Sequence, residues 1–421
     1  MTRFIGEEKL IAQNENFTEP GIQKITDKVY FYSSRAGNNL TLIVGEKTCM
    51  LIDSLFCDVE AHEALSAIQK TTSKPISLLV YTHTHPDHIS GAGVLAKNAK
   101  EIMAREMTVK PYGKSELIQD IAMLRGARQW GIGLTGEEAI NIGVGPLFLT
   151  GTAPVVLRPT RLFEEKNLNL QFEGTDIVLI AADGEADDQT FVWLPEEKVL
   201  CCGDDYYECF PNIYPIRGGQ YRNVSAWIDS LNTILSLDPE FLLPGHTRAL
   251  IGQSLVRETI TAYRDGIQFI LEETLKGMNR GLTPDQLIEH VQLPEHLRER
   301  PQLQEFYGKI SWSIRAIFSG YLGWFDGNPT NLGFMPVKSR AQRQLALVGG
   351  ADRVLEAARV ALENEDEQWS AELCDILLNA GERVKEAKSV KALALRLLAR
   401  LDENACARHY YLCSAKELEK E

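Results

Sequence analysis

The sequence lacks the features that direct a protein to a membrane or to a nucleic acid. No apolar run approaches the roughly 20 residues that a bilayer-spanning helix needs. Residues 1–8 include acidic side chains and have no apolar core, so we do not expect a secretory signal. The 44 Lys and Arg are outnumbered by 58 Asp and Glu, for a net charge of −14. Because phosphate backbones are bound by clustered basic side chains, we expect no nucleic-acid partner and no membrane partner.

Cysteine is also sparse, with eight residues in a chain of 421 and no Cys-x-x-Cys pair. Such a distribution is typical of reduced thiols in a protein core, and it argues against a disulfide framework and a thiol-ligated zinc. We therefore expect a cytoplasmic location. The hydrophobic fraction of 44% and the charged fraction of 24% are those of a globular protein. The length exceeds one ordinary core, so two domains are expected.

Histidine, in contrast, is concentrated at one place. His83, His85 and His88 fall within six residues together with Asp87, directly after the apolar run 76–80. That run predicts a buried strand, and open α/β sheets bind ligands at the carboxyl ends of their strands. Imidazole and carboxylate groups are suited to zinc and similar divalent ions. Four such groups are more than one tetrahedral ion uses, so the spacing indicates two adjacent metal ions.

The ends of later strands supply the other candidate ligands. Glu185, Asp204 and His246 each follow an apolar run and stand beside a glycine, where the backbone can approach a metal closely. A dinuclear hydrolytic site needs such additional ligands, and one of them must bridge the two ions. Neighbouring acids compete for these roles, and periodicity does not separate them: Asp183, Asp187, Asp188 and Asp205.

Two features near the cluster have two readings each. Asp53 ends the strand predicted over residues 48–53, and it either orients a ligand histidine or is a turn residue. Residues 130–149 form a glycine-rich yet apolar loop, which either faces the organic part of a substrate or simply covers the site. The remaining histidines are given no role: His62, His290, His296 and His409.

Hydrophobic patterning predicts an α/β sandwich followed by helices. Strands are predicted over residues 28–32, 39–44, 48–53, 76–80, 168–172, 177–182, 191–194, 199–202 and 241–243, with helices over 58–72 and 224–237. We assign residues 1–252 to this sandwich. Amphipathic helices are predicted over residues 254–275, 303–322 and 341–421, and a further helix is predicted to begin at Thr283-Pro284-Asp285. Residues 253–421 are therefore predicted to form an all-α domain for assembly or for shaping the pocket.

The run Thr82-His83-Thr84-His85-Pro86-Asp87-His88, with Gly203-Asp204 and Pro244-Gly245-His246, resembles the metallo-β-lactamase superfamily, whose αβ/βα sandwich holds two metals, usually zinc. Within it the chain is similar to the alkyl sulfatases, the type III zinc-dependent sulfatases. Their glutamate in place of a third histidine matches Glu185, and their bridging acid nineteen residues later matches Asp204. Their Asn and Arg, eight and thirteen residues beyond that acid, match Asn212 and Arg217. Their helical dimerisation domain has a segment like residues 315–329.

The resemblance implies a complete site. One metal would take His83, His85 and Glu185, and the other Asp87, His88 and His246, with Asp204 and a hydroxide between them. Asn212 and Arg217 would grip the anionic ester oxygens, and a guanidinium offers the charged, forked donor that an oxyanion needs. The implied activity is dinuclear, zinc-dependent hydrolysis of organic sulfate esters by a metal-activated hydroxide, with Asp87 and Asp204 as catalytic residues. The helical domain would pair two chains into a homodimer.

The chain departs from the family in its pocket. The bridging acid is normally Glu and is here Asp204, residues 184–189 differ from the family pattern, and a sulfate-contacting tyrosine is replaced near Gln129-Trp130. We also expect no C-terminal sterol-carrier-like domain. These differences leave the metal ligands in place and open the choice of substrate. The alternatives are a phosphoester, lactone or other ester at the same site, or a non-catalytic scaffold for assembly.

Overall fold

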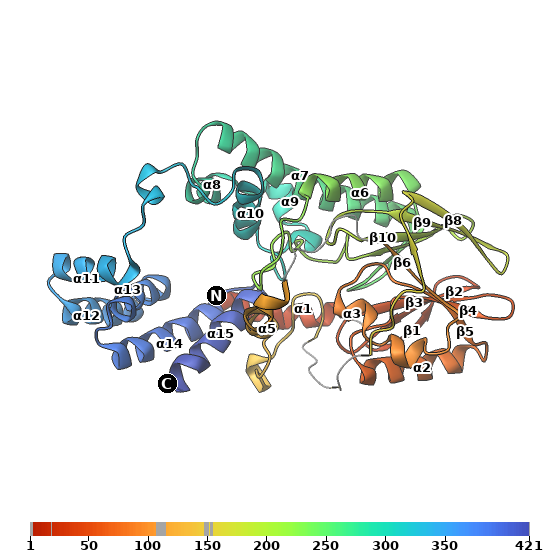
Figure 1. Ribbon diagram of the computed structural model, residues 1–421, viewed down its shortest axis with the longest axis horizontal. Helices are drawn as coiled ribbons and strands as arrows, with labels where there is room; N and C mark the ends of the chain where they lie inside the picture. The colour runs from red at the N-terminus through yellow and green to blue at the C-terminus, as the bar shows by residue number, and fades with distance from the viewer. Residues whose placement is uncertain (1–2, 18, 107–114, 147–150, 152–154, 421) are drawn as a thin grey trace.

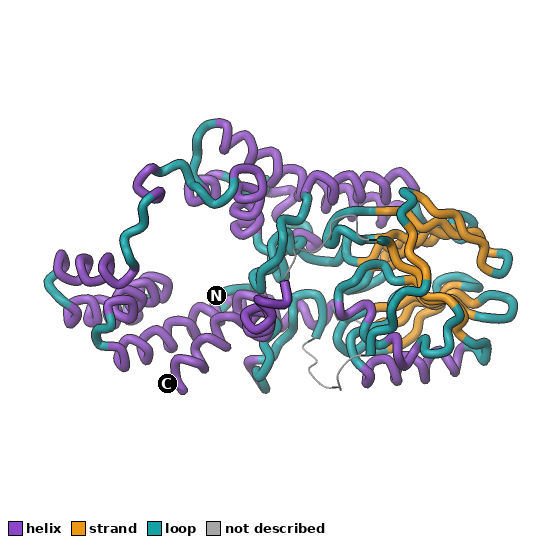
Figure 2. Tube along the Cα trace, viewed as in Figure 1, coloured by secondary structure: helices purple, strands orange, loops and turns teal. Residues whose placement is uncertain are grey.

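The computed structural model describes residues 3–17, 19–106, 115–146, 151 and 155–420. Two β-sheets pack face to face, with helices on both outer faces (Figures 1 and 2). The first sheet has the order β1-β2-β3-β4-β5-β6-β7, with strands Gly21–Lys24, Val29–Ser33, Asn39–Val44, Cys49–Ile52, Ile76–Val80, Glu101–Arg105 and Arg161–Phe163. The second has the order β13-β12-β11-β10-β9-β8, and its strands β8 to β13 are Asn167–Phe172, Thr175–Ala181, Thr190–Leu194, Val199–Gly203, Phe241–Pro244 and Leu250–Ile251.

Three apolar layers hold the sandwich together. The layer between the sheets contains Val80, Leu179 and Leu243, all almost fully buried. Helices α2 (Asp58–Thr71) and α4 (Ala92–Leu95) cover the outer face of the first sheet, and α6 (Val224–Leu237) and α7 (Gln253–Asn279) cover that of the second. Because each sheet buries one face on the other sheet and one on helices, the predicted αβ/βα sandwich followed by helices is confirmed.

Parallel pairing brings the predicted strand ends to one edge of the sandwich. Strands β4, β5 and β6 are parallel neighbours in the first sheet, and β11 and β12 are parallel neighbours in the second. The carboxyl ends of parallel strands meet at the same edge. The predicted strands are confirmed to within two residues at each end. Because the ends of the parallel strands meet at one edge, the polar residues that follow these strands lie together.

The remaining helices extend away from the sandwich and then return to it (Figure 1). Helices α8 (Pro284–His290), α9 (Glu295–Arg298) and α10 (Ile310–Leu322) lie near α7, whereas α11 (Val337–Val348), α12 (Ala351–Glu363) and α13 (Glu367–Ala380) form a separate bundle. Helices α14 (Val384–Leu401) and α15 (Ala405–Lys420) run back beside α1 (Ile5–Gln13) and α5 (Gln119–Gln129). The shorter helices are α3 (Pro86–Ile89) and the 3-10 turns Asn14–Asn16, Ser115–Ile118, Gly136–Glu138, Pro301–Leu303 and Pro329–Leu332.

The helix predicted over residues 303–322 is wrong at its beginning. Residues 304–309 form a loop, and α10 starts only at Ile310. The backbone of this loop is bonded to other segments: the Phe210 N–H donates to Gln304 O at 2.7 Å, and the Gly308 N–H donates to Phe210 O at 3.0 Å. The Asn404 side-chain amide donates hydrogen bonds to three further carbonyl oxygens of the same loop, those of Glu305, Tyr307 and Gly308. These long-range bonds replace the local ones that a helix would make.

Two expectations from composition can be compared with the structure. All eight cysteines are buried and none is in a disulfide. Among the described residues, no helix combines the length and the apolar character needed to cross a membrane. The division of the chain at 252–253 stays a prediction; α7, which begins at Gln253, packs on α6 and on the second sheet.

Candidate functional site

The histidine motif lies on the loop that leaves β5, as its apolar run predicts. Pro86 opens the single turn of α3, which follows His85 directly and carries Asp87 and His88. The His83 and His88 side chains are fully buried, whereas 26% of the His85 side chain and 27% of the Asp87 side chain stay exposed. The motif therefore presents two enclosed and two accessible groups at the edge of the sandwich.

The predicted ligands form two groups whose atoms lie within 4.8 Å of one another. The first ligand group is His83, His85, Glu185 and Asp204, and the second is Asp87, His88 and His246. In the first, His85 Nδ1 lies 2.9 Å from His83 Nε2 and 3.0 Å from Glu185 Oε2. In the second, Asp87 Oδ2 lies 3.2 Å from His246 Nε2 and 3.8 Å from His88 Nε2. This division matches the one that the resemblance implies.

Asp204 lies between the two ligand groups. Its Oδ2 is 3.7 Å from His83 Nε2 in the first group and 3.4 Å from His246 Nε2 in the second. Its Oδ1 is 3.4 Å from His88 Nε2. A carboxylate in this position has an oxygen within reach of each group, as a bridging ligand requires.

The donor set fits divalent cations. His88 Nε2, Glu185 Oε2 and Asp204 Oδ1 are buried and make no hydrogen bond within the described chain. Buried polar atoms almost always have a partner, so three orphaned atoms at one place need an explanation. Imidazole nitrogens and carboxylate oxygens without hydrogen bonds are the donors that zinc and similar ions take.

Hydrogen bonds orient the ligand histidines. His88 Nδ1 lies 2.9 Å from Asp53 Oδ2, and Asp53 is itself held by the Thr82 N–H at 2.7 Å. His246 Nδ1 lies 3.2 Å from the Gly37 carbonyl oxygen. A bond at Nδ1 fixes the ring and leaves Nε2 for a cation. Of the two readings of Asp53, the structure therefore favours the one in which it orients a ligand histidine.

Glycine is required beside two of the candidate ligands. A Cβ atom at Gly245 would lie 2.7 Å from His88 Cε1 and would also overlap Asp204 Oδ1. A Cβ atom at Gly184 would overlap the Asp205 carboxylate, which accepts a hydrogen bond from the Glu185 N–H at 3.0 Å. Glycine lets the backbone come this close because it has no side chain. The glycines noted beside Glu185 and His246 thus have a steric cause.

The buried charges of the site shift one another's pKa values. Burial disfavours the charge of Asp204, but His88 and His246 outweigh it and hold the pKa of this carboxyl well below its usual range. Burial lowers the pKa of His246, yet Asp204 and Asp87 outweigh burial and raise it to about 10. For His83, burial and the neighbouring His88 and His85 hold the pKa well below its usual range. A cation binding here displaces protons from imidazole, so its affinity rises with pH.

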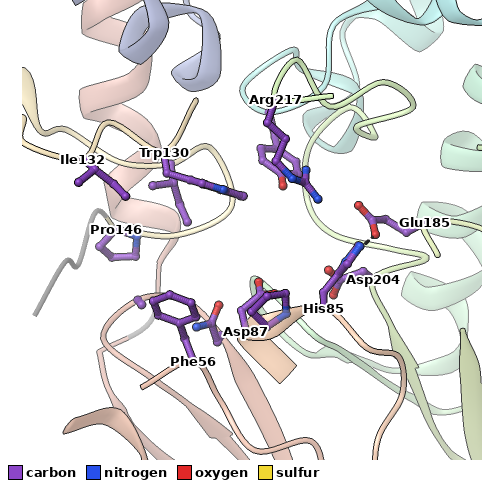
Figure 3. Close-up of a pocket in the computed structure, with 14 residues that line it drawn as sticks. Phe56, His85, Asp87, Trp130, Ile132, Pro146, Glu185, Asp204 and Arg217 are labelled. Carbon is purple, nitrogen blue, oxygen red and sulfur yellow. Dashed lines mark ion pairs between the residues drawn. The ribbon is translucent and has the colours of Figure 1, made fainter. Parts of the chain in front are cut away.

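A pocket of about 240 Å³ opens beside the two ligand groups (Figure 3). Its polar side is formed by His85, Asp87, Glu185, Asp204 and Arg217. Its apolar side carries Phe56, Trp130, Ile132 and Pro146, which point toward the polar side across the cavity, together with Ala36 and Ile142. Four residues of the predicted loop 130–149 therefore line the cavity: Trp130, Ile132, Ile142 and Pro146. Residues 147–149 lie outside the described residues.

Both ends of the chain hold this apolar wall in place. From α1, Gln13 donates to the Gly143 carbonyl oxygen at 2.7 Å, and the Leu10 carbonyl oxygen accepts from Asn141 at 2.8 Å. From α15, the buried Arg408 donates to the Glu137 carbonyl oxygen at 3.2 Å and pairs with Glu7 of α1 at 2.9 Å. Residues 130–146 are thus fixed by contacts between segments far apart in the sequence.

The two predicted substrate contacts have different locations. Arg217 lines the pocket and extends toward the ligand groups from above in Figure 3. Its backbone N–H donates to Gln129 Oε1 at 2.8 Å. Asn212 is 1% exposed and does not line the cavity, and both polar atoms of its amide are buried without a partner in the described part of the chain. The structure brings Arg217, but not Asn212, to the wall of the pocket.

The four acids that compete for ligand roles in the sequence lie outside the two ligand groups, and each is described by its own contacts or burial: Asp183, Asp187, Asp188 and Asp205. Asp183 pairs with Arg105, and Asp205 holds the Glu185 backbone. Burial raises the pKa of Asp188, against an opposing effect of Thr84, and burial also raises that of the half-buried Asp187. None of the four has a ligand atom within either group.

Three residues near the site were not found by pattern. Arg222 is buried and forms an ion pair with Glu185 Oε1, while its Nη1 also donates to the Asn212 carbonyl oxygen at 2.5 Å. Tyr307 lines the pocket from the loop that patterning had assigned to a helix. His409, given no role, is fully buried and its Nδ1 lies 3.1 Å from the Gln129 carbonyl oxygen. No local sequence signal marks these residues, because their partners are distant in the chain.

Comparison with known proteins agrees with the geometry. Residues 35–246 match the family described as the metallo-beta-lactamase superfamily, and residues 283–421 match alkyl sulfatase dimerisation. A linear primary-alkylsulfatase of Pseudomonas sp. is 34% identical over 86% of this chain and 70% of its own length. An alkyl/aryl-sulfatase of Saccharomyces cerevisiae is 29% identical over 94% of this chain and 64% of its own.

A solved structure has the same arrangement. The stereoselective inverting sec-alkylsulfatase of Pseudomonas sp. superposes with a TM-score of 0.89 at 27% identity, over 98% of this chain and 67% of that one. The present chain spans between 62% and 70% of the length of the four curated alkylsulfatases that it matches.

Proposed function

Because the chain belongs to the alkylsulfatase family of the metallo-β-lactamase superfamily, we propose that it is a metal-dependent hydrolase that cleaves an organic sulfate ester to an alcohol and inorganic sulfate. The observation that carries the proposal is the pocket, which joins a donor set for divalent cations to an anion-binding guanidinium and an apolar wall. A sulfate ester has the matching parts: an anionic head and an organic group. The metal-dependent reaction follows from the donor set, and the ester follows from Arg217 and the relatives.

The site residues have separate roles in this proposal. His83, His85 and Glu185 would hold one divalent ion, Asp87, His88 and His246 would hold a second, and Asp204, which lies near histidines of both groups, would contribute to both. We propose zinc for both, because the donors are imidazoles and carboxylates. Two ions bound there lower the pKa of water toward neutrality and neutralise charge that develops during ester cleavage. Asp53 and the Gly37 carbonyl keep two of the imidazoles in their liganding orientation.

The substrate is positioned by groups outside the ligand set. Arg217 binds the sulfate oxygens, since a guanidinium offers paired, charged donors to an oxyanion. Asn212, whose amide has no hydrogen-bond partner among described residues, stays a predicted second contact. Trp130, Ile132 and Phe56 face the organic portion and exclude water from it.

A substrate panel tests the function. Metal-replete protein is assayed with alkyl sulfates, aryl sulfates, phosphodiesters and lactones, and the product ion or alcohol is measured. We expect release of inorganic sulfate from alkyl and aryl sulfates and little turnover of phosphodiesters and lactones, because Arg217 and the apolar wall suit an anionic ester with one organic group and the relatives are alkyl and aryl sulfatases. Absence of sulfate release from every alkyl sulfate would refute the proposal. Turnover of another ester alone would assign the same site to that ester. A protein that binds no metal and turns over none of these esters would be assigned as a scaffold.

The helical region is proposed to pair two copies of the chain. Residues 283–421 match the dimerisation family, and large apolar side chains are exposed there, including Trp324, Leu332, Phe334 and Leu347. Exposed apolar patches of this kind mark interaction surfaces. We expect light scattering to give twice the 47.1 kDa of the chain. A mass of one chain at micromolar concentration would contradict this expectation.

A further inference from the structure

Tyr307 is held rigidly at the wall of the pocket. It lies in the loop between the 3-10 turn Pro301–Leu303 and α10, is 7% exposed and lines the cavity together with Glu185 and Arg217. The Asn404 amide nitrogen fixes this loop by donating to the carbonyl oxygens of Glu305, Tyr307 and Gly308, at 2.8, 3.0 and 3.1 Å. The phenol ring therefore has a defined place beside the proposed metal centre.

The aromatic ring of Tyr307 packs against two aromatic neighbours. Tyr207 meets it edge to face, with ring centroids 5.5 Å apart, and Trp130 lies at 5.9 Å with a tilt of 30°. Contacts of this type favour one ring orientation. The ring cannot swing away from the cavity without losing both of them.

The hydroxyl of Tyr307 is not used by the protein. No hydrogen bond joins it to another described residue, and the tyrosine that carries it is 7% exposed and lines the cavity. Burial, with Cys406 and Glu185 nearby, raises the pKa of this phenol well above its usual range, against the opposing charges of Arg217 and Arg222. At neutral pH this hydroxyl therefore stays protonated, on a residue that lines the cavity.

Few other groups of the described pocket wall can give a proton. The Arg217 guanidinium does not give up its proton in proteins. His85, Asp87, Glu185 and Asp204 belong to the two ligand groups. Asn38 and Trp130 line the cavity too, but an amide and an indole donate hydrogen bonds without transferring a proton. Tyr307 is the acid that remains.

We propose that Tyr307 is a catalytic acid, whose hydroxyl donates its proton to the ester oxygen as the bond between sulfur and that oxygen breaks. This assignment rests on the proposed sulfate ester hydrolysis. Hydroxide derived from water forms the new bond to sulfur, and the electron pair of the broken bond stays on the alcohol oxygen. That oxygen takes the Tyr307 proton. The product hydrogen sulfate, a strong acid, then gives its proton to the tyrosinate and regenerates the phenol. The proton that water lost on forming hydroxide goes to the solvent, so the products are the alcohol, sulfate and one proton.

The test compares Tyr307→Phe with the parent on sulfate esters of similar size whose alcohols differ in acidity, from hexyl through fluorinated alkyl to 4-nitrophenyl sulfate. General acid catalysis contributes about 10²- to 10⁴-fold, so we expect a loss of this order for hexyl sulfate. For 4-nitrophenyl sulfate we expect a loss below about tenfold, because 4-nitrophenolate leaves without a proton. An equal loss across the series, or no loss, would overturn the proposal.

Two further measurements separate the acid from other roles. In heavy-oxygen water the label must appear in sulfate, and a label in the alcohol would overturn the assignment, because the bond between sulfur and oxygen would then be intact. Hexane-1-sulfonate has no ester oxygen, so its inhibition constant is expected to stay within about threefold of the parent. A weakening of sulfonate binding in parallel with the lost activity would mean that Tyr307 binds the anion instead.

The control variant is Tyr263→Phe in α7, which removes a buried hydroxyl that has no hydrogen-bond partner among the described residues. Tyr263 packs in the core and does not line the cavity. We expect its kinetics to equal those of the parent. Metal content and melting temperature are measured for both variants, so a folding defect is recognised directly. If the parent protein cleaves no sulfate ester, the proposed function fails, whereas parent activity with an unaltered Tyr307→Phe refutes the catalytic acid alone.

Discussion

His246→Ala is expected to lose one of the two proposed metal ions and to reduce kcat/KM by on the order of 10³-fold or more, because removing the imidazole opens the second ligand group next to Asp204, the proposed bridging acid. His246 is 4% exposed, and its Nε2 lies within 3.4 Å of both Asp87 and Asp204. Elemental analysis gives the metal-to-chain ratio, and steady-state kinetics on an alkyl sulfate give the loss of turnover. We expect the fold to survive, since the ring's one other polar bond is to the Gly37 carbonyl.

The control for this variant is His62→Ala, the same change at an exposed position of α2. Its metal content and kcat/KM are expected to match the parent. If His246→Ala retained two ions and full turnover, the assignment of the second ligand group would be wrong. Loss of both ions would instead mean that the two sites fill cooperatively through Asp204.

Arg217→Ala is expected to lower kcat/KM for alkyl sulfates by about 10- to 100-fold, because a hydrogen bond to a charged group contributes roughly 1.5–3 kcal/mol. The loss falls on binding of the anion in both the ground state and the transition state, so KM rises and inhibition by an alkyl sulfonate weakens. Steady-state kinetics and sulfonate inhibition measure the two effects. The metal content should not change, since Arg217 contacts neither ligand group through a hydrogen bond or ion pair in the described structure.

Arg217→Lys separates charge from shape. Lysine keeps the positive charge but offers a point charge in place of a fork, so we expect partial recovery at most. Arg161→Ala removes an exposed guanidinium from β7, at a pair with Glu101 of 3.5 Å, and should leave kinetics unchanged. Should Arg217→Ala hydrolyse sulfate esters as well as the parent, the anion contact must be assigned elsewhere.

Much of the sandwich was predictable from the sequence because its signals are local. Alternating and continuous apolar runs marked β3, β5 and β12 to within one residue at either end. The run from His83 to His88 needs no distant partner to be noticed, because its ligands lie within one loop. Glu185 and His246 could be proposed because each follows a strand and has a glycine beside it. Parallel pairing brings the ends of β11 and β12, and so Asp204 and His246, together, whereas β9, which precedes Glu185, has antiparallel neighbours on both sides.

The rest of the site depends on contacts between distant segments, which periodicity does not encode. Patterning extended a helix through Tyr307, but the Asn404 side chain, 97 residues later, takes the carbonyl oxygens of that loop. Arg222 is a lone arginine in sequence and becomes the partner of Glu185 only through the fold. Asn212 was matched to the family by spacing alone, and spacing does not say whether its amide reaches the cavity.

Helices α1 and α15 both bond to residues 130–146, and these contacts limit which parts of the enzyme can be exchanged between relatives. A chimera that exchanged the helical half for that of a relative would also replace Tyr307 and the α15 contacts behind Trp130. The substrate range would travel with the exchanged half, although the metal ligands would all stay in the other half. In design terms, the helical half would carry substrate specificity as a unit, and its boundary with the rest of the chain lies at the wall of the active site.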